Sequence, residues 1–222
     1  MSNLTALITG ASRGIGAAIA SKFAKEGINV LAPTRNDLDL SSGESINSFL
    51  SSLKQRVDIL VNNAGINVLS GITEITSSNI QDTFQINLFA PIQLTKGIST
   101  QMMDRKFGRI VNISSIWSVI SRAKRVTYSA SKAGINGLTR TLAIELAPYN
   151  ILVNSVAPGY VNTELTRKNN SEQEIKSSQN TIPLLRLAEP EEIAEVVFFL
   201  SSERNTYITG QVITVDGGFT CQ

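Results

Sequence analysis

The chain has 222 residues, 42% of them hydrophobic and 17% charged, which is enough apolar sequence to bury a substantial core. Its 20 basic and 18 acidic residues give a net charge of +2, which argues against nucleic acid or an anionic membrane as a partner. The lack of histidine excludes a Ser-His-Asp triad and leaves no metal site to expect. With one cysteine, Cys221, no signal-peptide pattern and no membrane-spanning run, the sequence predicts a cytoplasmic protein.

Short apolar runs alternate with segments of helical periodicity along the chain. The runs that predict buried strands lie at 4–9, 29–33, 57–61, 109–113, 151–156 and 211–215, with a very short further candidate at 37–40. The segments that predict helices lie at 17–26, 42–54, 78–103, 128–146 and 191–201. This alternation predicts one α/β domain over residues 1–222, a doubly wound parallel sheet of the Rossmann type in three αβα layers. The polar stretch 162–179 has little periodicity, and we expect a substrate lid over residues 160–185.

A glycine-rich turn follows the first predicted strand and opens a helix. Its sequence, Thr9-Gly-Ala-Ser-Arg-Gly-Ile-Gly16, has the spacing Gly-x-x-x-Gly-x-Gly. Glycines let a backbone approach a pyrophosphate closely, and a helix N-terminus supplies free N–H groups and a positive dipole end. We therefore expect a nucleotide phosphate here, with a purely structural turn as the alternative. The candidate cofactor residues of the turn are Gly10, Ser12, Arg13, Gly14, Ile15 and Gly16.

Tyr128 and Lys132 lie four residues apart in a predicted helix, so their side chains share one face. A nearby ammonium favours phenolate over phenol, and we expect Lys132 to lower the pKa of Tyr128 from its ordinary value of about 10. Such a tyrosine can exchange a proton with a carbonyl or alcohol oxygen, which Ser115, thirteen residues upstream, could also hold. Taken alone, the pair is equally typical of a solvated helix face.

The glycine turn, Ser115, Tyr128 and Lys132 together resemble the short-chain dehydrogenase/reductase family, and the resemblance extends over residues 4–219. Four further motifs match the family at its spacing. They are Asn62-Asn-Ala-Gly65, Asn87, Pro158-Gly159 and the segment from Gly210 to Gly218. The chain is most similar to the members described as 3-oxoacyl-[acyl-carrier-protein] reductases.

The resemblance implies hydride transfer between a nicotinamide cofactor and a carbonyl or secondary alcohol, with Tyr128 as the acid and base. Lys132 would lower the pKa of Tyr128, helped by oxidised nicotinamide, and would bind the cofactor ribose. Ser115 would position the substrate oxygen, and Asn87 would hold a water in a proton path. Ser114 is an alternative to Ser115, although the spacing to the tyrosine favours Ser115. Asn87 could instead only brace a helix.

The resemblance implies further cofactor contacts along the chain. These residues are Asn63, Ala64, Gly65, Tyr128, Lys132, Pro158, Gly159, Val161 and Thr163. Alternatively, Asn62 and Asn63 chiefly fasten neighbouring strands, and Thr163 is an ordinary loop residue.

The end of the second predicted strand bears on the choice between NAD and NADP. An acidic residue there binds both ribose hydroxyls and repels a 2′-phosphate. Thr34 and Arg35 stand at this point instead, and Arg13 in the glycine turn could supply a second cation. We therefore expect NADP(H) rather than NAD(H), with a solvated Arg35 as the alternative. Asp39 matches the family's aspartate that meets the adenine amino group.

The chain departs from the family between Arg35 and Asp39, where there is no room for the helix that normally links the second and third strands. We expect a shortened connection here. It could open the adenine pocket to solvent.

Three substrate classes remain open. A 3-oxoacyl thioester on an acyl carrier protein is the first, and Lys106 matches one basic docking position whereas Tyr149 replaces a second. Trp117 suggests instead a sugar ring or another flat substrate. A small ketone is the third class. A further segment carries three cations that could bind an anionic substrate or form a solvated loop. They are Arg122, Lys124 and Arg125.

Two expectations concern the whole protein. A cofactor-binding sensor or scaffold without turnover is the alternative from another functional class, although the intact Ser115, Tyr128, Lys132 and Asn87 argue for an enzyme. We also expect a homotetramer, because in the family the helices matching 78–103 and 128–146 pair across a two-fold axis and the last strand makes a second interface.

Overall fold

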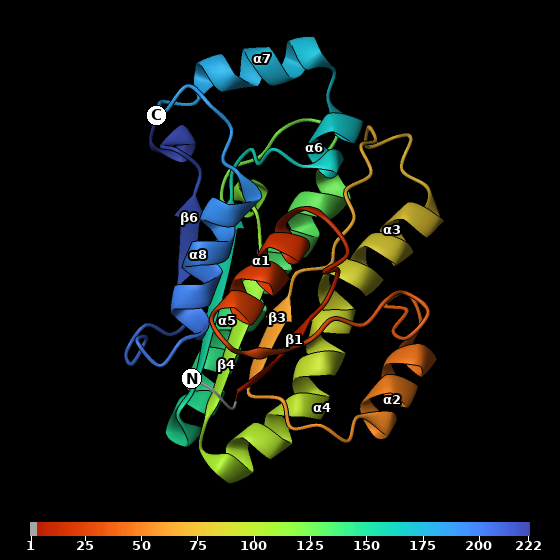
Figure 1. Ribbon diagram of the computed structural model, residues 1–222. Helices are drawn as coiled ribbons and strands as arrows, with labels where there is room; N and C mark the ends of the chain where they lie inside the picture. The colour runs from red at the N-terminus through yellow and green to blue at the C-terminus, as the bar shows by residue number, and fades with distance from the viewer. Residues whose placement is uncertain (1–3) are drawn as a thin grey trace.

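The computed structural model describes residues 4–222. Its strands are β1 (Thr5–Ile8), β2 (Asn29–Leu31), β3 (Ile59–Asn62), β4 (Gly108–Ile113), β5 (Ile151–Pro158) and β6 (Val212–Val215). They form one parallel sheet in the order β2-β1-β3-β4-β5-β6 (Figure 1). The chain runs outward from β1 to β2 and then crosses back to β3 on the other side of β1, so the predicted doubly wound sheet is confirmed.

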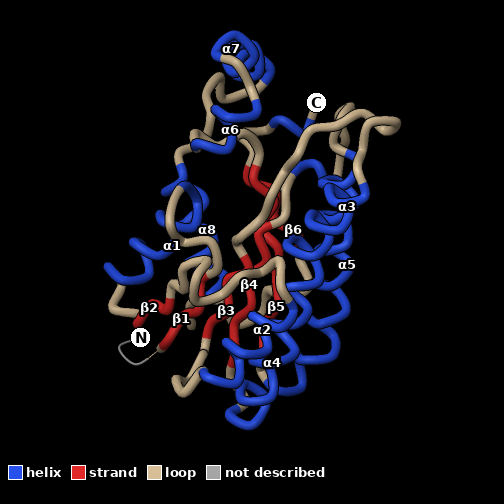
Figure 2. Tube along the Cα trace, turned by 90° about the vertical axis from the view of Figure 1, so that its right-hand side faces the viewer, coloured by secondary structure: helices blue, strands red, loops and turns tan. Residues whose placement is uncertain are grey.

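Eight α-helices surround this sheet in the described part of the chain. They are α1 (Gly14–Lys25), α2 (Gly43–Ser52), α3 (Ser77–Phe84), α4 (Ala90–Arg105), α5 (Val126–Leu146), α6 (Glu164–Asn169), α7 (Glu172–Thr181) and α8 (Pro190–Ser201). Figure 2 shows the strands between α1 and α8 on one side and α2, α4 and α5 on the other. Within residues 4–222, no helix is both long and apolar enough to span a bilayer.

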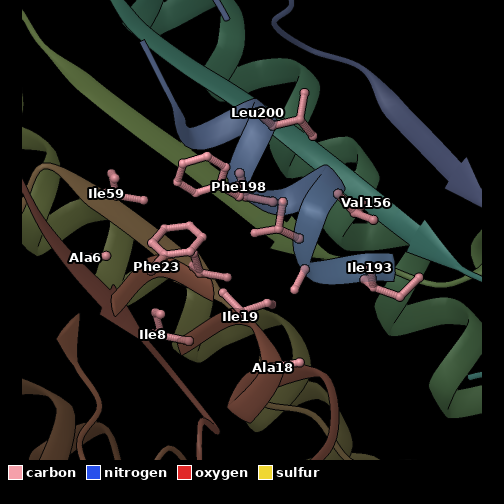
Figure 3. Packing of buried hydrophobic residues seen from close by; sticks show 14 of the residues in the cluster. Ala6, Ile8, Ala18, Ile19, Phe23, Ile59, Val156, Ile193, Phe198 and Leu200 are labelled. Atoms are coloured by element: carbon pink, nitrogen blue, oxygen red, sulfur yellow. The ribbon is translucent and has the colours of Figure 1, made fainter. Parts of the chain in front are cut away.

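The two faces of the sheet carry separate cores because successive strand residues point in opposite directions. Ala6 and Ile8 of β1 join the core under α1 and α8, whereas Leu7 between them joins the core under α2, α4 and α5. In the first core the rings of Phe23 and Phe198 meet edge to face with centroids 5.6 Å apart (Figure 3). This packing holds α1, and therefore the glycine turn before it, against the sheet.

The helix predicted over 78–103 is divided into α3 and α4 by a π-helical turn at Gln85–Phe89. Pro91 follows this turn and explains the break, because it has no N–H and its ring would clash with the carbonyl four residues before it. A π-turn holds one residue more than an α-turn and leaves the apolar pattern of both flanks intact. Hydrophobic periodicity therefore predicted one continuous helix.

The candidate strand at 37–40 was wrong, because this segment forms turns. The Asp37 carboxylate accepts hydrogen bonds from Thr34 N at 2.9 Å and from Thr34 Oγ1 at 2.7 Å, which closes the turn. Residues 32–42 connect β2 to α2 without a helix, as the shortened connection predicted. As a result, β2 is the outermost strand on its side of the sheet.

The predicted lid contains two helices, α6 and α7, at one end of the molecule (Figures 1 and 2). Both begin at capping residues that outweigh their weak apolar periodicity. Thr163 accepts a hydrogen bond from Thr166 N, and Ser171 and Glu174 form a reciprocal capping box. This Ser-x-x-Glu sequence was a signal for a helix in a stretch that hydrophobicity alone left without structure.

Candidate active site

A cavity of about 480 Å³ lies at the carboxyl ends of β1 to β5, where the direction of chain winding reverses. It is lined by every residue that the sequence predicted for catalysis or cofactor binding except Asn87. These residues are Gly10, Ser12, Arg13, Gly14, Ile15, Gly16, Thr34, Arg35, Asp39, Asn63, Ala64, Gly65, Ser115, Tyr128, Lys132, Pro158, Gly159, Val161 and Thr163. A second cavity of about 500 Å³, bordered by α1, α6 and α8, contains no catalytic candidate.

The glycine turn approaches the segment after β3 so closely that side chains would not fit. Gly10 has φ +66°, and a Cβ there would lie 2.9 Å from Ala64 Cα. A Cβ on Gly16 would collide with Gly10 O and the Asn63 amide. The bare backbone and the N-terminus of α1 therefore face the cavity together, which fits a pyrophosphate.

Asn63 fastens two strands as well as lining the cavity. Its Nδ2 donates to Thr9 O at 2.9 Å and to Gly10 O at 3.1 Å. Thr9 Oγ1 in return accepts from Asn63 N and Ala64 N, both at 3.1 Å. The structural role considered for Asn63 is thus present, and Asn62 has a similar one through a 2.8 Å hydrogen bond to Asn112 Oδ1.

The two neighbouring serines after β4 have different surroundings. Ser114 Oγ lies within hydrogen-bonding distance of Asn136 Oδ1 at 2.8 Å, Ser118 Oγ at 3.1 Å and Lys132 O at 3.4 Å. Ser115 Oγ accepts from Trp117 N at 3.2 Å, and its hydroxyl meets the Tyr128 phenol, whose pKa it lowers through a hydrogen bond. This difference favours Ser115 as the residue that meets a substrate oxygen.

The expected acidification of Tyr128 by Lys132 is not a property of the protein alone. Burial raises the pKa of Tyr128, and the Ser115 hydroxyl and Arg125 oppose this shift only in part. Burial also lowers the pKa of Lys132 to about 8, and its Nζ donates to Ile113 O at 2.7 Å. Withdrawal of the phenolate from water therefore outweighs both opposing groups, and the prediction that Lys132 lowers the pKa of Tyr128 was wrong for the chain by itself.

Asn87 lies in the π-helical turn and holds the segment after β3. Its Oδ1 accepts from Ile66 N and its Nδ2 donates to Ile66 O, both at 2.9 Å, and Nδ2 also contacts Ser131 Oγ at 3.1 Å. A Cβ on Gly65 would lie 3.3 Å from Asn87 Oδ1 and 3.4 Å from Lys132 Nζ. Asn87 is therefore a bracing residue that also stands next to the lysine.

Two exposed arginines line the cavity, Arg35 after β2 and Arg13 in the glycine turn. Arg35 is paired with Asp39 at 3.5 Å and Arg13 with Glu164 at 3.1 Å, and all four side chains are at least one-third exposed. Exposed pairs of this kind contribute little stability, so both guanidinium groups can exchange partners at small cost. A cofactor phosphate beside Thr34 would meet the exposed Arg35 and no carboxylate at position 34.

The segment after β5 lines the cavity next to the glycine turn, since a Cβ on Gly14 would lie 3.4 Å from Thr163 Cγ2. Gly159 N donates to Val215 O at 2.9 Å, and a Cβ on Gly159 would lie 2.8 Å from Asp216 Cα. Thr163 lines the cavity while its side chain caps α6, so it is more than an ordinary loop residue.

The sequence missed an aromatic cluster on the wall next to Ser115. Trp117 packs edge to face against Tyr160 and Phe219, with ring centroids 6.1 and 6.3 Å away, and Tyr160 meets Phe219 at 5.6 Å. Trp117 and Tyr160 line the cavity. The three rings come from segments far apart in the chain, so no local pattern could bring them together.

The basic docking position expected at Lys106 does not lie at the mouth of this cavity. Lys106 precedes β4 and Tyr149 precedes β5, and Asn150 Nδ2 joins the two segments by donating to Lys106 O at 3.1 Å. Both residues are therefore at the amino ends of these strands, whereas the cavity is at the carboxyl ends. The prediction that Lys106 helps to dock an acyl carrier protein at the mouth of the active site was therefore wrong within a single chain.

Known proteins match this chain over nearly all of its length. A family model described as enoyl-(acyl carrier protein) reductase matches residues 36–220, and one described as short chain dehydrogenase matches residues 4–48. The chain belongs to the short-chain dehydrogenase/reductase family. It is an oxidoreductase, as the glycine turn and the Ser-Tyr-Lys spacing predicted.

Named relatives include both reductases and dehydrogenases. The 3-oxoacyl-[acyl-carrier-protein] reductase of Aquifex aeolicus is 38% identical over 237 aligned residues, which cover 96% of this chain and 95% of the relative. A candidate NAD(P)-dependent gluconate 5-dehydrogenase from Beutenbergia cavernae, solved with NADP bound at low occupancy, has a TM-score of 0.94 at 35% identity and covers 99% of this chain and 97% of its own. A 4-hydroxyisoleucine dehydrogenase mutant in complex with NADH and succinate has a TM-score of 0.93 at 30% identity, with 98% and 99% covered.

Proposed function

We propose that this short-chain oxidoreductase interconverts a carbonyl and a secondary alcohol with NADP(H), using Tyr128 as the proton donor and acceptor. The observation that supports it is the sharing of one cavity by Ser115, Tyr128, Lys132 and the glycine turn. The bare turn fits the pyrophosphate of a dinucleotide, which supplies or accepts a hydride at its nicotinamide when bound.

Tyr128 suits the direction of carbonyl reduction. Burial raises the pKa of this phenol, so the proton is present at neutral pH and can pass to the carbonyl oxygen while the carbonyl carbon gains the hydride. Ser115 donates its hydroxyl hydrogen to the same oxygen. Alcohol oxidation is the reverse, in which the phenolate takes the hydroxyl proton.

Lys132 and Asn87 would return a proton to Tyr128 after reduction. Lys132 has a pKa lowered to about 8 by burial, which makes it a competent proton carrier near neutral pH. Asn87 Oδ1 and Lys132 Nζ lie on the same side of Gly65, 3.3 and 3.4 Å from the point that a Cβ on this glycine would occupy. Asn87 therefore lies on the way from the lysine to the segment after β3.

The choice of NADP(H) is supported by charge. Thr34 stands where an acidic residue would repel the 2′-phosphate, and the exposed Arg13 and Arg35 both line the cavity. The gluconate dehydrogenase candidate with bound NADP is similar over nearly its whole chain.

A 3-oxoacyl thioester, free or on an acyl carrier protein, is the substrate class that the named reductases support. A sugar acid or small ketone is the second candidate. It is favoured by Trp117, whose ring lines the cavity beside Ser115 and offers a flat apolar wall.

Two further proposals concern the assembled enzyme. Residues 160–185 act as a lid, supported by Leu165 and Asn169 lining the cavity and by the 3.3 Å hydrogen bond from Asn169 Nδ2 to Asn67 O. The chain forms a homotetramer, supported by exposed apolar side chains such as Ile92 of α4 and Ile144 of α5, and light scattering would measure its mass.

The deciding experiment follows NADPH oxidation against a panel of ketones, 3-oxoacyl thioesters and sugar acids. We expect turnover that falls by about a thousandfold in Tyr128→Phe, because the ring stays and only the acidic proton is lost. Unchanged turnover in that variant would contradict the proposed chemistry. Binding of NADPH without turnover of any carbonyl would favour a sensor or scaffold instead.

A further inference from the structure

Arg125 is a buried cation to which the proposed chemistry gives no role. It is 5% exposed and lines the cavity together with Ser115 and Tyr128. The segment after β3 covers its backbone, because Ser70 N donates to Lys124 O at 3.1 Å and Ser70 pairs with Arg125 in a short parallel bridge. The residue is thus built into the wall rather than left on a surface loop.

The Arg125 guanidinium is held against an aromatic ring. Its Cζ lies 4.8 Å from the centroid of Trp117, which is 9% exposed and is itself fixed by Tyr160 and Phe219. Stacking sets the plane of the guanidinium and therefore the directions of its N–H donors. A guanidinium held in a fixed plane is oriented to donate two parallel hydrogen bonds to a planar acceptor with two oxygens.

No described residue neutralises Arg125. It takes part in none of the ion pairs among residues 4–222, and its buried Nε has no hydrogen-bond partner there. The carboxylates that line the cavity, Asp39 and Glu164, are paired with arginines at the cofactor end. Buried charges are ordinarily paired, so this one indicates a ligand.

The other charges near Arg125 do not supply the missing partner. Arg122 and Lys124 are cations of the same loop, and Arg122 donates to Tyr160 Oη at 2.9 Å. Glu174 lies close enough to Arg122 for that arginine to contribute to lowering its pKa, but its carboxylate accepts from Ser171 N and Oγ at 2.8 and 2.9 Å. This corner of the cavity therefore carries uncompensated positive charge.

We propose that Arg125 binds a carboxylate of the substrate, so that the enzyme acts on small oxo acids and the corresponding hydroxy acids. The inference rests on the function proposed above, because it places the anion in the cavity that holds Tyr128 and Ser115. A carboxylate brings one negative charge to one buried cation. A planar carboxylate also matches the two parallel donors of a stacked guanidinium.

The test compares acids with their neutral esters. Acetoacetate and levulinate are paired with methyl acetoacetate and methyl levulinate, and NADPH oxidation gives kcat and KM for each. We expect the wild type to prefer the acids by about 30-fold or more in kcat/KM, which is the lower end of what an unpaired buried charge costs. Arg125→Gln should remove this preference mainly through KM, and Arg125→Lys should retain part of it.

Lys124→Gln is the matched control, because it removes a cation from the adjacent, solvent-exposed position. It should keep the preference for acids. An equal loss on acids and esters in Arg125→Gln would indicate a merely structural residue and would overturn the proposal. A wild type without preference for acids would overturn it even if the Arg125 variants failed to fold.

Binding without chemistry separates this proposal from the proposed function. An oxo acid together with NADP⁺ cannot react, so calorimetric titration of that complex measures binding alone. Tighter binding of levulinate than of its ester, lost in Arg125→Gln, would support the role of Arg125 even if no carbonyl were turned over. Equal binding of acid and ester would overturn it while leaving carbonyl reduction intact.

Discussion

Lys132 and Tyr128 share one face of α5, yet the ammonium of Lys132 donates to Ile113 O at 2.7 Å and lies 5.8 Å from the centre of the Tyr128 ring. The lysine is thus anchored to β4 and not to the phenol. Its charge is partly lost to burial, which lowers the pKa of Lys132 to about 8. Activation of the tyrosine therefore depends on what enters the cavity.

Titration of the phenolate absorbance, wild type minus Tyr128→Phe, would show this dependence. In the protein alone we expect Tyr128 to titrate above the ordinary tyrosine value of about 10, because burial raises its pKa. Adding NADP⁺ should move the midpoint down, since oxidised nicotinamide brings a positive charge. A midpoint at or below the ordinary value in the free protein would contradict the assignment to burial.

Lys132→Met should stabilise the protein at neutral pH. A lysine with a lowered pKa binds fewer protons when folded than when unfolded, so wild-type stability rises with pH between about 8 and 10.5. We expect the variant to gain about 2 kcal/mol near pH 7 and to lose this advantage as the pH rises through that window. Urea unfolding at several pH values measures it, with the exposed Lys124→Met as a control whose difference stays flat.

Gly16→Ala should weaken both folding and cofactor binding. The new Cβ would collide with Gly10 O and the Asn63 amide, which join the turn to the segment after β3. Such overpacking typically costs about 1–3 kcal/mol, and the distorted turn should weaken NADPH binding as well. Gly43→Ala is the control, because its Cβ meets only the flexible end of Gln93 at 3.4 Å and should change neither thermal unfolding nor NADPH titration.

Arg35→Asp should reverse the cofactor preference. A carboxylate there would repel a 2′-phosphate and could bind the ribose hydroxyls of NAD(H) instead. We expect the Kd of NADPH to rise by about 30-fold while that of NADH stays level or falls. Fluorescence titration with both cofactors measures this, with Arg204→Asp as a surface control. Equal effects on both cofactors would indicate that Arg35 does not meet the phosphate.

The sequence correctly predicted those structural features whose signal lies within a single segment of the chain. Apolar runs located all six strands of the described sheet, and the spacing of Ser115 from Tyr128 selected the serine whose hydroxyl meets the Tyr128 phenol. Each of these features depends on residues close together in the chain or on family spacing. The cavity then brings them together because parallel strands end at one side of the sheet.

Features that depend on distant segments could not be predicted in this way. The burial of Arg125 requires Trp117 on one side and the segment of Ser70 on the other. The pKa of Tyr128 depends on how much water the whole cavity excludes, which a Tyr-x-x-x-Lys pattern does not reveal. The two helices of the predicted lid, α6 and α7, were missed for a simpler reason. Their signal lay in capping residues such as Ser171 and not in hydrophobicity.

The position of β2 at the border of the sheet has a consequence for how this protein meets other chains. An outermost strand presents unpaired backbone groups that can recruit a strand from a neighbour and begin aggregation. Here β2 has only three residues and Pro33, which has no N–H to donate, follows shortly after it. The edge strand that the shortened connection leaves is therefore too short to pair with a strand of another chain. The shorter connection thus does not create a site for edge-to-edge polymerisation.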